Sequence, residues 1–190
     1  GASVLRLPVR LGAWGAAQAG LRYAVRNGFS EAITLDADGQ HHPERLPELL
    51  ESKYGAGVHK GAFVVHSNKD LGASIASGSH RCTGMVIVPC SMKTLAGVAL
   101  GLSRSLIERA ADVMLKEQRK LILVPRETPM SLPALRHQVA AAEAGAMILP
   151  AMPAFYQKPK TIDDLADFIA GKILTGLGFE QRLFDPWKGE

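Results

Sequence analysis

The sequence predicts an α/β fold in which a parallel β-sheet is covered by helices. Short runs of aliphatic and β-branched residues recur along the chain, and such runs are typical of buried strands. Longer segments with apolar residues at helical spacing lie between them. This alternation favours a parallel, doubly wound sheet. The chain has 190 residues, of which 47% are hydrophobic, so we expect one core and a single domain over residues 1–190.

The elements are expected in a regular order along the chain. Strands are predicted at Ala32–Leu35, Ala62–Val65, Met85–Val88, Leu121–Val124 and Ala146–Leu149. Helices are predicted at Ala13–Arg26, Pro43–Ser52, Leu71–Ser77, Ser103–Glu117, Pro133–Ala144 and Ile162–Leu177. Ligands of doubly wound sheets bind beyond the carboxyl ends of the strands, so functional residues are expected directly after each strand.

Composition excludes several classes of function. The formal net charge is +4, and the Lys and Arg residues are dispersed rather than clustered, which argues against a nucleic-acid surface and fits small anionic ligands better. No apolar run approaches the length of a membrane span, and no secretory leader is found, so we expect a soluble, cytoplasmic protein. Of the two cysteines, Cys90 follows an apolar strand and is expected to pack rather than react.

The residues after the strand Met85–Val88 form a small, hydroxyl-rich turn that can open a helix. Ser91, Met92, Lys93 and Thr94 lie in this turn. Free backbone N–H groups at a helix start suit a phosphate group. Plain helix capping by Ser91 or Thr94 is an equally good reading of the turn.

Further charged residues follow the next helix and strand. Arg109 and Lys116 are seven residues apart, two turns along one helix face. They are read either as part of a solvated charged face or as ligand-binding cations. Arg126 and Glu127 follow the strand Leu121–Val124, where a guanidinium can bind phosphate in a bidentate manner. The Glu127 carboxylate is either an ion-pair partner of Arg126 or a proton-transfer group.

The loop after the fifth predicted strand adds aromatic groups to this edge. Pro150, Pro153, Phe155 and Tyr156 lie in it, and Lys172 on the last helix adds another cation. Cations, phosphate-binding turns and apolar side chains together suit an apolar ligand that carries phosphate.

Several runs, taken in this order, resemble the UbiX-type flavin prenyltransferases. They are HSNKDLGASIASGSH, MVIVPCSMKTLAG, RAADVMLKE, LVPRETPMSL, AEAGAMILPAMPAFYQKP and TIDDLADFIAGKIL, within residues 62–190. The resemblance implies a three-layer α/β fold of the flavodoxin-like or Rossmann-like kind. It also implies a homo-oligomer, a dodecamer in the family, in which sites are built across subunit contacts.

The resemblance implies roles for individual residues. Ser91, Met92, Lys93, Thr94 and Arg126 match the residues that hold FMN. The residues that match the dimethylallyl phosphate site are Lys116, Tyr156, Lys172 and Arg109, with Arg126 shared, and Glu127 matches a position suited to proton transfer. Lys172 is arginine in many relatives, so charge is kept without bidentate geometry.

The implied reaction joins a dimethylallyl group to reduced FMN. Alkylation at N5 and ring closure at C6 give prenylated FMN, which a UbiD-type decarboxylase receives in the ubiquinone pathway. No metal is implied, because preorganised cations can stabilise the departing phosphate.

The segment 1–55 departs from the family. The strand and Gly-Ala-Ser-Gly turn that begin family members are not found intact, although Gly1-Ala2-Ser3 echoes the turn. Residues 8–50 instead resemble a fragment of dolichol-phosphate-mannose-synthase-like glycosyltransferases, in which the counterparts of Asp36 and Asp38 bind a metal and a sugar nucleotide. A chimera joined near residues 51–64 is therefore one hypothesis. The alternative functions are an inactive or flavin-binding remnant and a metal-dependent sugar-nucleotide binder.

Overall fold

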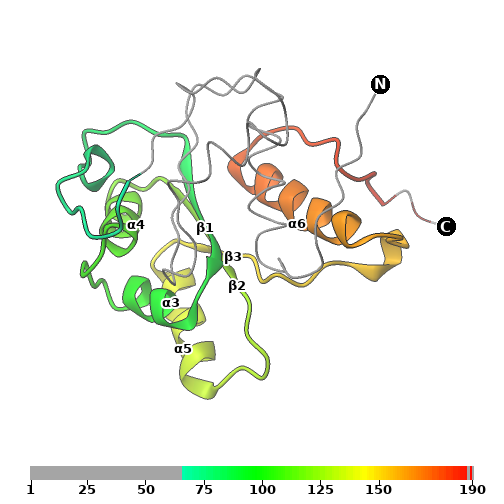
Figure 1. The fold of residues 1–190 in the computed structure, drawn as a ribbon, viewed down its shortest axis with the longest axis horizontal. Coiled ribbons are helices and arrows are strands. Elements are labelled where there is room, and N and C mark those ends of the chain that lie inside the picture. Colours follow the sequence, from blue (N-terminus) through cyan, green and yellow to red (C-terminus); the bar gives the residue numbers. More distant parts are fainter. Residues whose placement is uncertain (1–65, 188, 190) are drawn as a thin grey trace.

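The fold is that of a computed structural model, which describes residues 66–187 and residue 189 (Figure 1). Four predicted elements lie outside the described residues, namely the strands Ala32–Leu35 and Ala62–Val65 and the helices Ala13–Arg26 and Pro43–Ser52. The glycosyltransferase-like segment and its Asp36 and Asp38 lie outside them as well.

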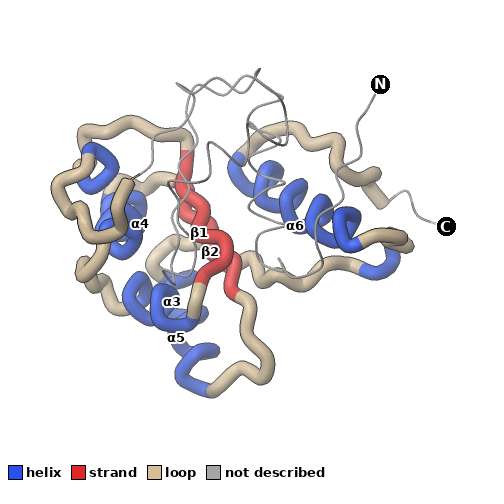
Figure 2. The backbone as a smooth tube through the Cα atoms, in the orientation of Figure 1, coloured by secondary structure: helices blue, strands red, loops and turns tan. Residues whose placement is uncertain are grey.

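A parallel sheet of three strands forms the centre of the described part of the chain (Figure 2). The strands are β1 (Gly84–Cys90), β2 (Lys120–Pro125) and β3 (Met147–Ile148), in the spatial order β1-β2-β3. These positions confirm the three predicted strands after residue 66. β3 is shorter than expected, but its pairing with β2 continues through Leu149 N–H to Leu123 C=O at 2.8 Å and Ala151 N–H to Pro125 C=O at 3.0 Å.

Helices cover both faces of this sheet, which makes three layers. One face carries α3 (Met92–Ala99), α4 (Leu106–Lys116) and α5 (Leu132–Glu143), and the other carries α6 (Ile162–Leu177), as Figure 1 shows. The buried strand β2 contributes side chains to the core on each face of the sheet, because successive side chains of a strand point to opposite sides. Leu121 and Leu123 pack in the α3–α5 core, whereas Ile122 and Val124 pack against α6.

Two predicted helices differ from the structure. The segment Leu71–Ser77 is helical only as a short 3-10 turn, η3 (Ser74–Ala76). Its start is taken up by a local turn, in which the Asp70 carboxylate accepts a hydrogen bond from Gly72 N–H at 3.0 Å. The helix expected from Ser103 begins at Leu106 instead, because Ser105 is its N-cap and its hydroxyl accepts from Glu108 N–H.

The start of α4 is fixed by contacts with distant parts of the chain. Asn68 accepts the N–H groups of Leu106 and Ile107, at 2.9 and 3.0 Å, through its backbone and side-chain oxygens. Glu108 is only 5% exposed, and its carboxylate accepts from the backbone and guanidinium of Arg104. The Glu108 side chain lies directly against Gly97 of α3, where a Cβ atom would collide with it. This close approach fixes α3, and therefore the turn that opens it, against α4.

No helix in the described part of the chain is both long and apolar enough to cross a membrane.

Candidate functional site at the carboxyl edge of the sheet

The turn after β1 leads into α3, and two backbone N–H groups at the start of this helix have no hydrogen-bond acceptor within it. Ser91 is the N-cap, and its hydroxyl accepts from Thr94 N–H at 3.2 Å and lies 3.0 Å from the Thr94 hydroxyl. Ser91 therefore does cap the helix, which was one of the two readings of this turn. The N–H groups of Met92 and Lys93 have no acceptor within the helix. Because Lys93 is exposed, the turn combines N–H donors with a cation and suits an anion.

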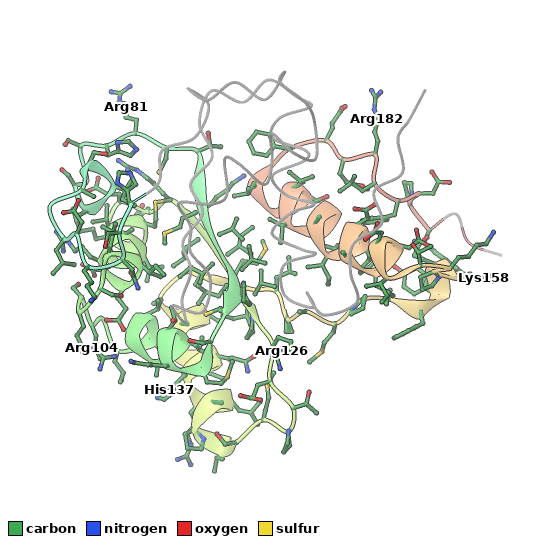
Figure 3. The ribbon with its side chains drawn as sticks, in the orientation of Figure 1. Arg81, Arg104, Arg126, His137, Lys158 and Arg182 are labelled. Atoms are coloured by element: carbon green, nitrogen blue, oxygen red, sulfur yellow. The ribbon has the colours of Figure 1, made fainter. Side chains whose placement is uncertain are left out.

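Arg126 lies beside this turn on the neighbouring strand. Cys90 of β1 and Pro125 of β2 are partners in the parallel register, so Ser91 and Arg126 are the next residues on adjacent strands, which are about 4.8 Å apart in a sheet. In Figure 3, Arg126 after β2 and Arg81 before β1 lie at opposite ends of the sheet. The predicted cluster of FMN-binding residues is thus brought together at one edge.

The Glu127 carboxylate is not held by Arg126. Both side chains are exposed, and Glu127 accepts a hydrogen bond from Thr128 N–H at 3.0 Å. Among the described residues, no ion pair joins Arg126 and Glu127. Of the two readings of Glu127, the ion-pair partner is therefore not observed, and the carboxylate remains able to take or give a proton.

Cys90 packs beneath the same turn. Its side chain is 1% exposed and belongs to the core of the α3–α5 face, which confirms the prediction that it packs. Burial raises the pKa of the Cys90 thiol to about 12, because a thiolate would lose its hydration there. The thiol stays protonated at neutral pH, so it is not a nucleophile at this edge.

Tyr156 and Lys172 form a second group on the α6 side of the molecule. Tyr156 lies in the 3-10 turn η4 (Phe155–Gln157), and its ring meets that of Phe168 edge to face, with centroids 6.3 Å apart. The Lys172 ammonium lies over the same Phe168 ring, 5.5 Å from its centroid. Figure 3 shows Lys158, which directly follows η4, well away from Arg126. Phe168 therefore joins the phenol to the ammonium, and its ring packs in the same core cluster as Val124 of β2.

Arg109 and Lys116 form a third group, and they are engaged with neighbouring protein groups. Arg109 donates to Ala76 C=O at 3.2 Å and to the Asp112 carboxylate at 3.0 Å. Lys116 forms an ion pair with Glu117. The hydrogen bond and the charge of Lys116 lower the pKa of the Glu117 carboxyl.

The direction of α4 separates Lys116 from Arg126 in one copy of the chain. Lys116 ends α4 just before β2 begins at Lys120, whereas Arg126 follows the end of β2. The six residues of β2 span roughly 20 Å at about 3.3 Å per residue. One copy therefore does not bring Lys116 and Arg126 to the same place.

Three aromatic residues and one glycine around Lys172 were missed in the sequence. They are Phe168, Phe184, Trp187 and Gly171, and each contacts the Tyr156 and Lys172 group or makes room for it. Phe168 and Lys172 are spaced i, i+4 on one helix face, and this spacing could have indicated their contact. The part of the chain that the structure describes contains no group of three or more metal-ligating side chains.

Comparison with known proteins places the chain among flavoproteins. The Flavoprotein family profile matches residues 57–174. The chain is 50% identical to the flavin prenyltransferase UbiX of Halalkalibacterium halodurans, over 85% of this chain and 75% of that protein. It is 55% identical to the flavin prenyltransferase UbiX of Alkalihalophilus pseudofirmus, over 84% of this chain and 76% of that protein.

Solved structures agree with this placement. A crystal structure of a UbiX protein in complex with FMN and dimethylallyl pyrophosphate matches with a TM-score of 0.78 and 36% identity, over 94% of this chain and 93% of that one. A dodecameric FMN-dependent UbiX-like decarboxylase from Escherichia coli O157:H7 matches with a TM-score of 0.74 and 36% identity, over 96% of both chains. The three-layer flavodoxin-like fold predicted from the sequence is confirmed.

The likeness also reaches further toward the N-terminus than the motifs indicated. The alignment with the Halalkalibacterium halodurans protein covers 162 residues of this chain, which is more than the stretch from residue 62 to residue 190 contains. Part of the segment assigned to a glycosyltransferase-like fragment therefore aligns with the flavin prenyltransferase. The division at residues 55–62 stays a prediction.

Proposed function

The chain belongs to the UbiX-type flavin prenyltransferases, and we propose that it transfers a dimethylallyl group from dimethylallyl phosphate to reduced FMN. The product, prenylated FMN, serves a UbiD-type decarboxylase. This function was expected from the motifs in residues 62–190, and the identity of 50% or more to two flavin prenyltransferases supports it. The residue roles below are part of the proposal.

The observation that carries the proposal is the pairing of Cys90 with Pro125. It brings the free N–H groups of Met92 and Lys93 and the guanidinium of Arg126 to one edge of the sheet. These donors fit the phosphate of FMN, because a helix start and a guanidinium both favour an anion. Ser91 and Thr94 shape the turn through their mutual hydrogen bond. When bound, reduced FMN supplies the nucleophile that accepts the prenyl group.

The second group fits an allylic phosphate. The ammonium of Lys172 and the hydroxyl of Tyr156 can donate to phosphate, while the partly exposed ring of Phe184 provides an apolar surface for the prenyl carbons. As the carbon–oxygen bond of the donor breaks, negative charge grows on the departing phosphate. Fixed cations stabilise that charge best where water is excluded. Glu127 is the candidate for proton transfer at the flavin edge.

Assembly of several copies would unite the three groups. One copy does not bring Lys116 to Arg126, because the length of β2 lies between them, and a relative that matches 96% of the chain is a dodecamer. We therefore propose that Arg109, Lys116, Tyr156 and Lys172 complete sites that contain another copy's Arg126.

A surface suited to such assembly lies on α5. Leu132, Leu135 and Val139 are 59%, 46% and 58% exposed and are spaced i, i+3 and i+7, which places them on one helix face. We call these three residues the α5 stripe. An exposed apolar stripe of this kind is typical of a surface that a partner covers. The α5 helix begins five residues after Glu127, so a copy seated on the stripe would adjoin the flavin edge.

The proposal is tested by mass spectrometry of the flavin after anaerobic incubation of the purified protein with reduced FMN and dimethylallyl phosphate. The expected product is heavier than FMN by one prenyl unit. Dimethylallyl pyrophosphate is the matched second donor, because the similar UbiX structure contains it. A flavin of unchanged mass with both donors would refute the proposal, and flavin absorbance without product would favour a flavin-binding remnant.

We also propose that the protein acts in the cytoplasm. Its two cysteines, Cys82 and Cys90, are both free thiols, which suits a reducing compartment.

A further inference from the structure

The segment that follows α6 runs back along that helix and reaches the Tyr156 and Lys172 group. Figure 1 shows it returning beside α6 toward the start of the helix. We call residues 180–187 the return segment. It contributes two aromatic side chains, Phe184 and Trp187, to the surroundings of the two proposed donor-binding residues.

Phe184 of the return segment contacts two side chains of α6. Its ring packs on Phe168 with centroids 4.7 Å apart, and the Lys172 ammonium lies 5.7 Å from its centroid. Lys172 therefore sits over two aromatic rings at once, one from its own helix and one from the return segment. Cations are attracted to aromatic faces, so the two rings restrict where the ammonium can point.

Gly171 makes room for this arrangement. A Cβ atom at position 171 would lie 2.5 Å from Phe184 Cε1 and 2.9 Å from Gln181 Oε1, so any larger residue would push the return segment away. Gln181 also shapes the segment itself. Its side-chain oxygen accepts from Leu183 N–H and Phe184 N–H at 2.8 and 3.2 Å, and its amide donates to Phe184 C=O at 3.1 Å.

Trp187 acts on the other proposed donor-binding residue. Its ring meets Tyr156 edge to face with centroids 5.4 Å apart, and Tyr156 also contacts Phe168. The Gln157 side chain donates to Asp185 C=O at 3.1 Å, which ties the return segment to η4. Tyr156 thus contacts one ring from α6 and one from the return segment.

We infer that the return segment positions Lys172 and Tyr156 for the phosphate of the prenyl donor, with Phe184 and Trp187 as its positioning residues. The inference rests on the proposed function only for the identity of the donor. The Phe184 ring has no hydrogen-bond donor, so its effect is exerted through the ammonium. Trp187 carries an indole N–H as well as a ring, and Trp187→Phe separates the effect of the ring from that of the N–H.

The test compares Phe184→Leu, Trp187→Ala and Gly171→Ala with the parent chain. Binding of dimethylallyl phosphate is followed by calorimetry with FMN present, and FMN affinity is measured separately. Each variant is expected to weaken donor binding about tenfold, which corresponds to about 1.4 kcal/mol, and to leave FMN affinity within about twofold of the parent, a difference of less than 0.5 kcal/mol.

Two control variants and one further measurement on Gly171→Ala separate positioning from simple loss of stability. Trp187→Phe keeps a ring against Tyr156 and should bind the donor like the parent. Arg182→Ala removes an exposed cation from the same segment, which Figure 3 shows pointing away from α6, and should also have no effect. Gly171→Ala favours the helical state of α6 itself, so its weakened donor binding should not be accompanied by melting of that helix in circular dichroism.

Parent-like donor binding in Phe184→Leu and Trp187→Ala would overturn the inference, and so would equal losses of FMN and donor affinity. A parent chain that does not bind dimethylallyl phosphate would overturn it as well. If the parent binds the donor in a Phe184-dependent manner but forms no prenylated flavin, the inference stands and the proposed function fails.

Discussion

The carboxyl edge of the sheet and the far end of α4 both carry cations, but the two regions use them differently. At the edge, Arg126 and Lys93 are exposed, and no ion pair to either is found among the described residues. On α4, Arg109 in the first turn and Lys116 at the end contact the carboxylates of Asp112 and of the C-cap residue Glu117, and beyond the helix Arg119 donates to Gly78 C=O and His80 C=O at 2.6 Å each. Edge cations are therefore available to a ligand, whereas Arg109 and Arg119 are hydrogen-bonded to the backbone of residues 76–80 and Lys116 is paired with Glu117.

This difference shows what a binding role would require of Lys116. Its side chain is half exposed, and its charge is already paired with that of Glu117. To bind a donor phosphate in another copy's site, Lys116 must either leave its ion pair with Glu117 or contact the carboxylate and the phosphate together. Arg126 needs no such exchange. Variants at the two ends should consequently differ in size of effect and in dependence on assembly.

The largest effect is expected for Arg126→Ala. Arg126 is proposed to contact both FMN and the donor phosphate, and each lost charge-assisted hydrogen bond costs about 1.5–3 kcal/mol, or roughly ten- to hundredfold. Steady-state measurement of prenyl transfer should show kcat/KM reduced by roughly a hundredfold or more. Because the side chain is exposed, thermal unfolding should stay unchanged. Arg126→Lys should retain part of the activity, since it keeps the charge without the bidentate geometry. A parent-like rate in Arg126→Ala would remove the edge from the proposed site.

Mixed assemblies test whether the two ends meet in different copies. Lys116→Ala and Arg126→Ala should each be nearly inactive alone, but co-expression should restore activity, because some sites would receive an intact Arg126 from one copy and an intact Lys116 from another. The matched control is co-expression of Arg126→Ala with Glu127→Ala. These residues are adjacent in one loop, so their variants should not complement each other. Absence of recovery in the first mixture would place both residues in one copy's site or remove Lys116 from the site.

The α5 stripe provides a smaller, assembly-level effect. Val139→Asp puts a charge at the C-terminal end of the α5 stripe, and burying that charge against a second copy would be costly. Light scattering should show a smaller assembly, and activity should fall with it. Leu71→Asp introduces the same charge at another exposed apolar side chain, on η3's side of the molecule, and should leave the assembly intact. An unchanged assembly in Val139→Asp would mean that copies meet elsewhere.

The sequence was sufficient to predict local features, but not to predict which distant parts of the chain contact one another. The α6 bounds were predicted without error, because Thr161 and Asp164 form a reciprocal cap at its start and Gly178 ends it in the left-handed conformation. The Ser91 turn and Arg126 were predicted at one edge because parallel strands place their carboxyl ends together.

Long-range contacts account for what was missed. The Phe184 ring fills the space left by the missing side chain of Gly171. These two residues belong to no common sequence motif, so nothing in the sequence indicated their contact. The motifs of the family name Lys116 and Arg126 together, but they do not indicate that the length of β2 separates them in one copy. The turn that normally opens the family fold would fall in the segment before residue 66, which lies outside the described residues, so the predicted departure of residues 1–55 from the family is not tested by the structure.

The smallest effect is expected for Glu117→Gln, which isolates the Lys116 pairing. The hydrogen bond and charge of Lys116 lower the pKa of Glu117 below its ordinary value of 4.5. A group whose pKa is lowered on folding adds stability that is fully present above its unfolded pKa, because the unfolded chain takes up the proton first as the pH falls. The parent should therefore be slightly more stable than the variant at pH 7. This difference should disappear as the pH falls below 4.5 through the lowered folded pKa. Thermal unfolding of both proteins between neutral and acidic pH measures it, with high salt as the control, since salt screens an exposed ion pair. A difference that persists in strong acid would mean that Glu117 stabilises the protein by packing rather than by charge, and that Lys116 is free to bind phosphate without any exchange.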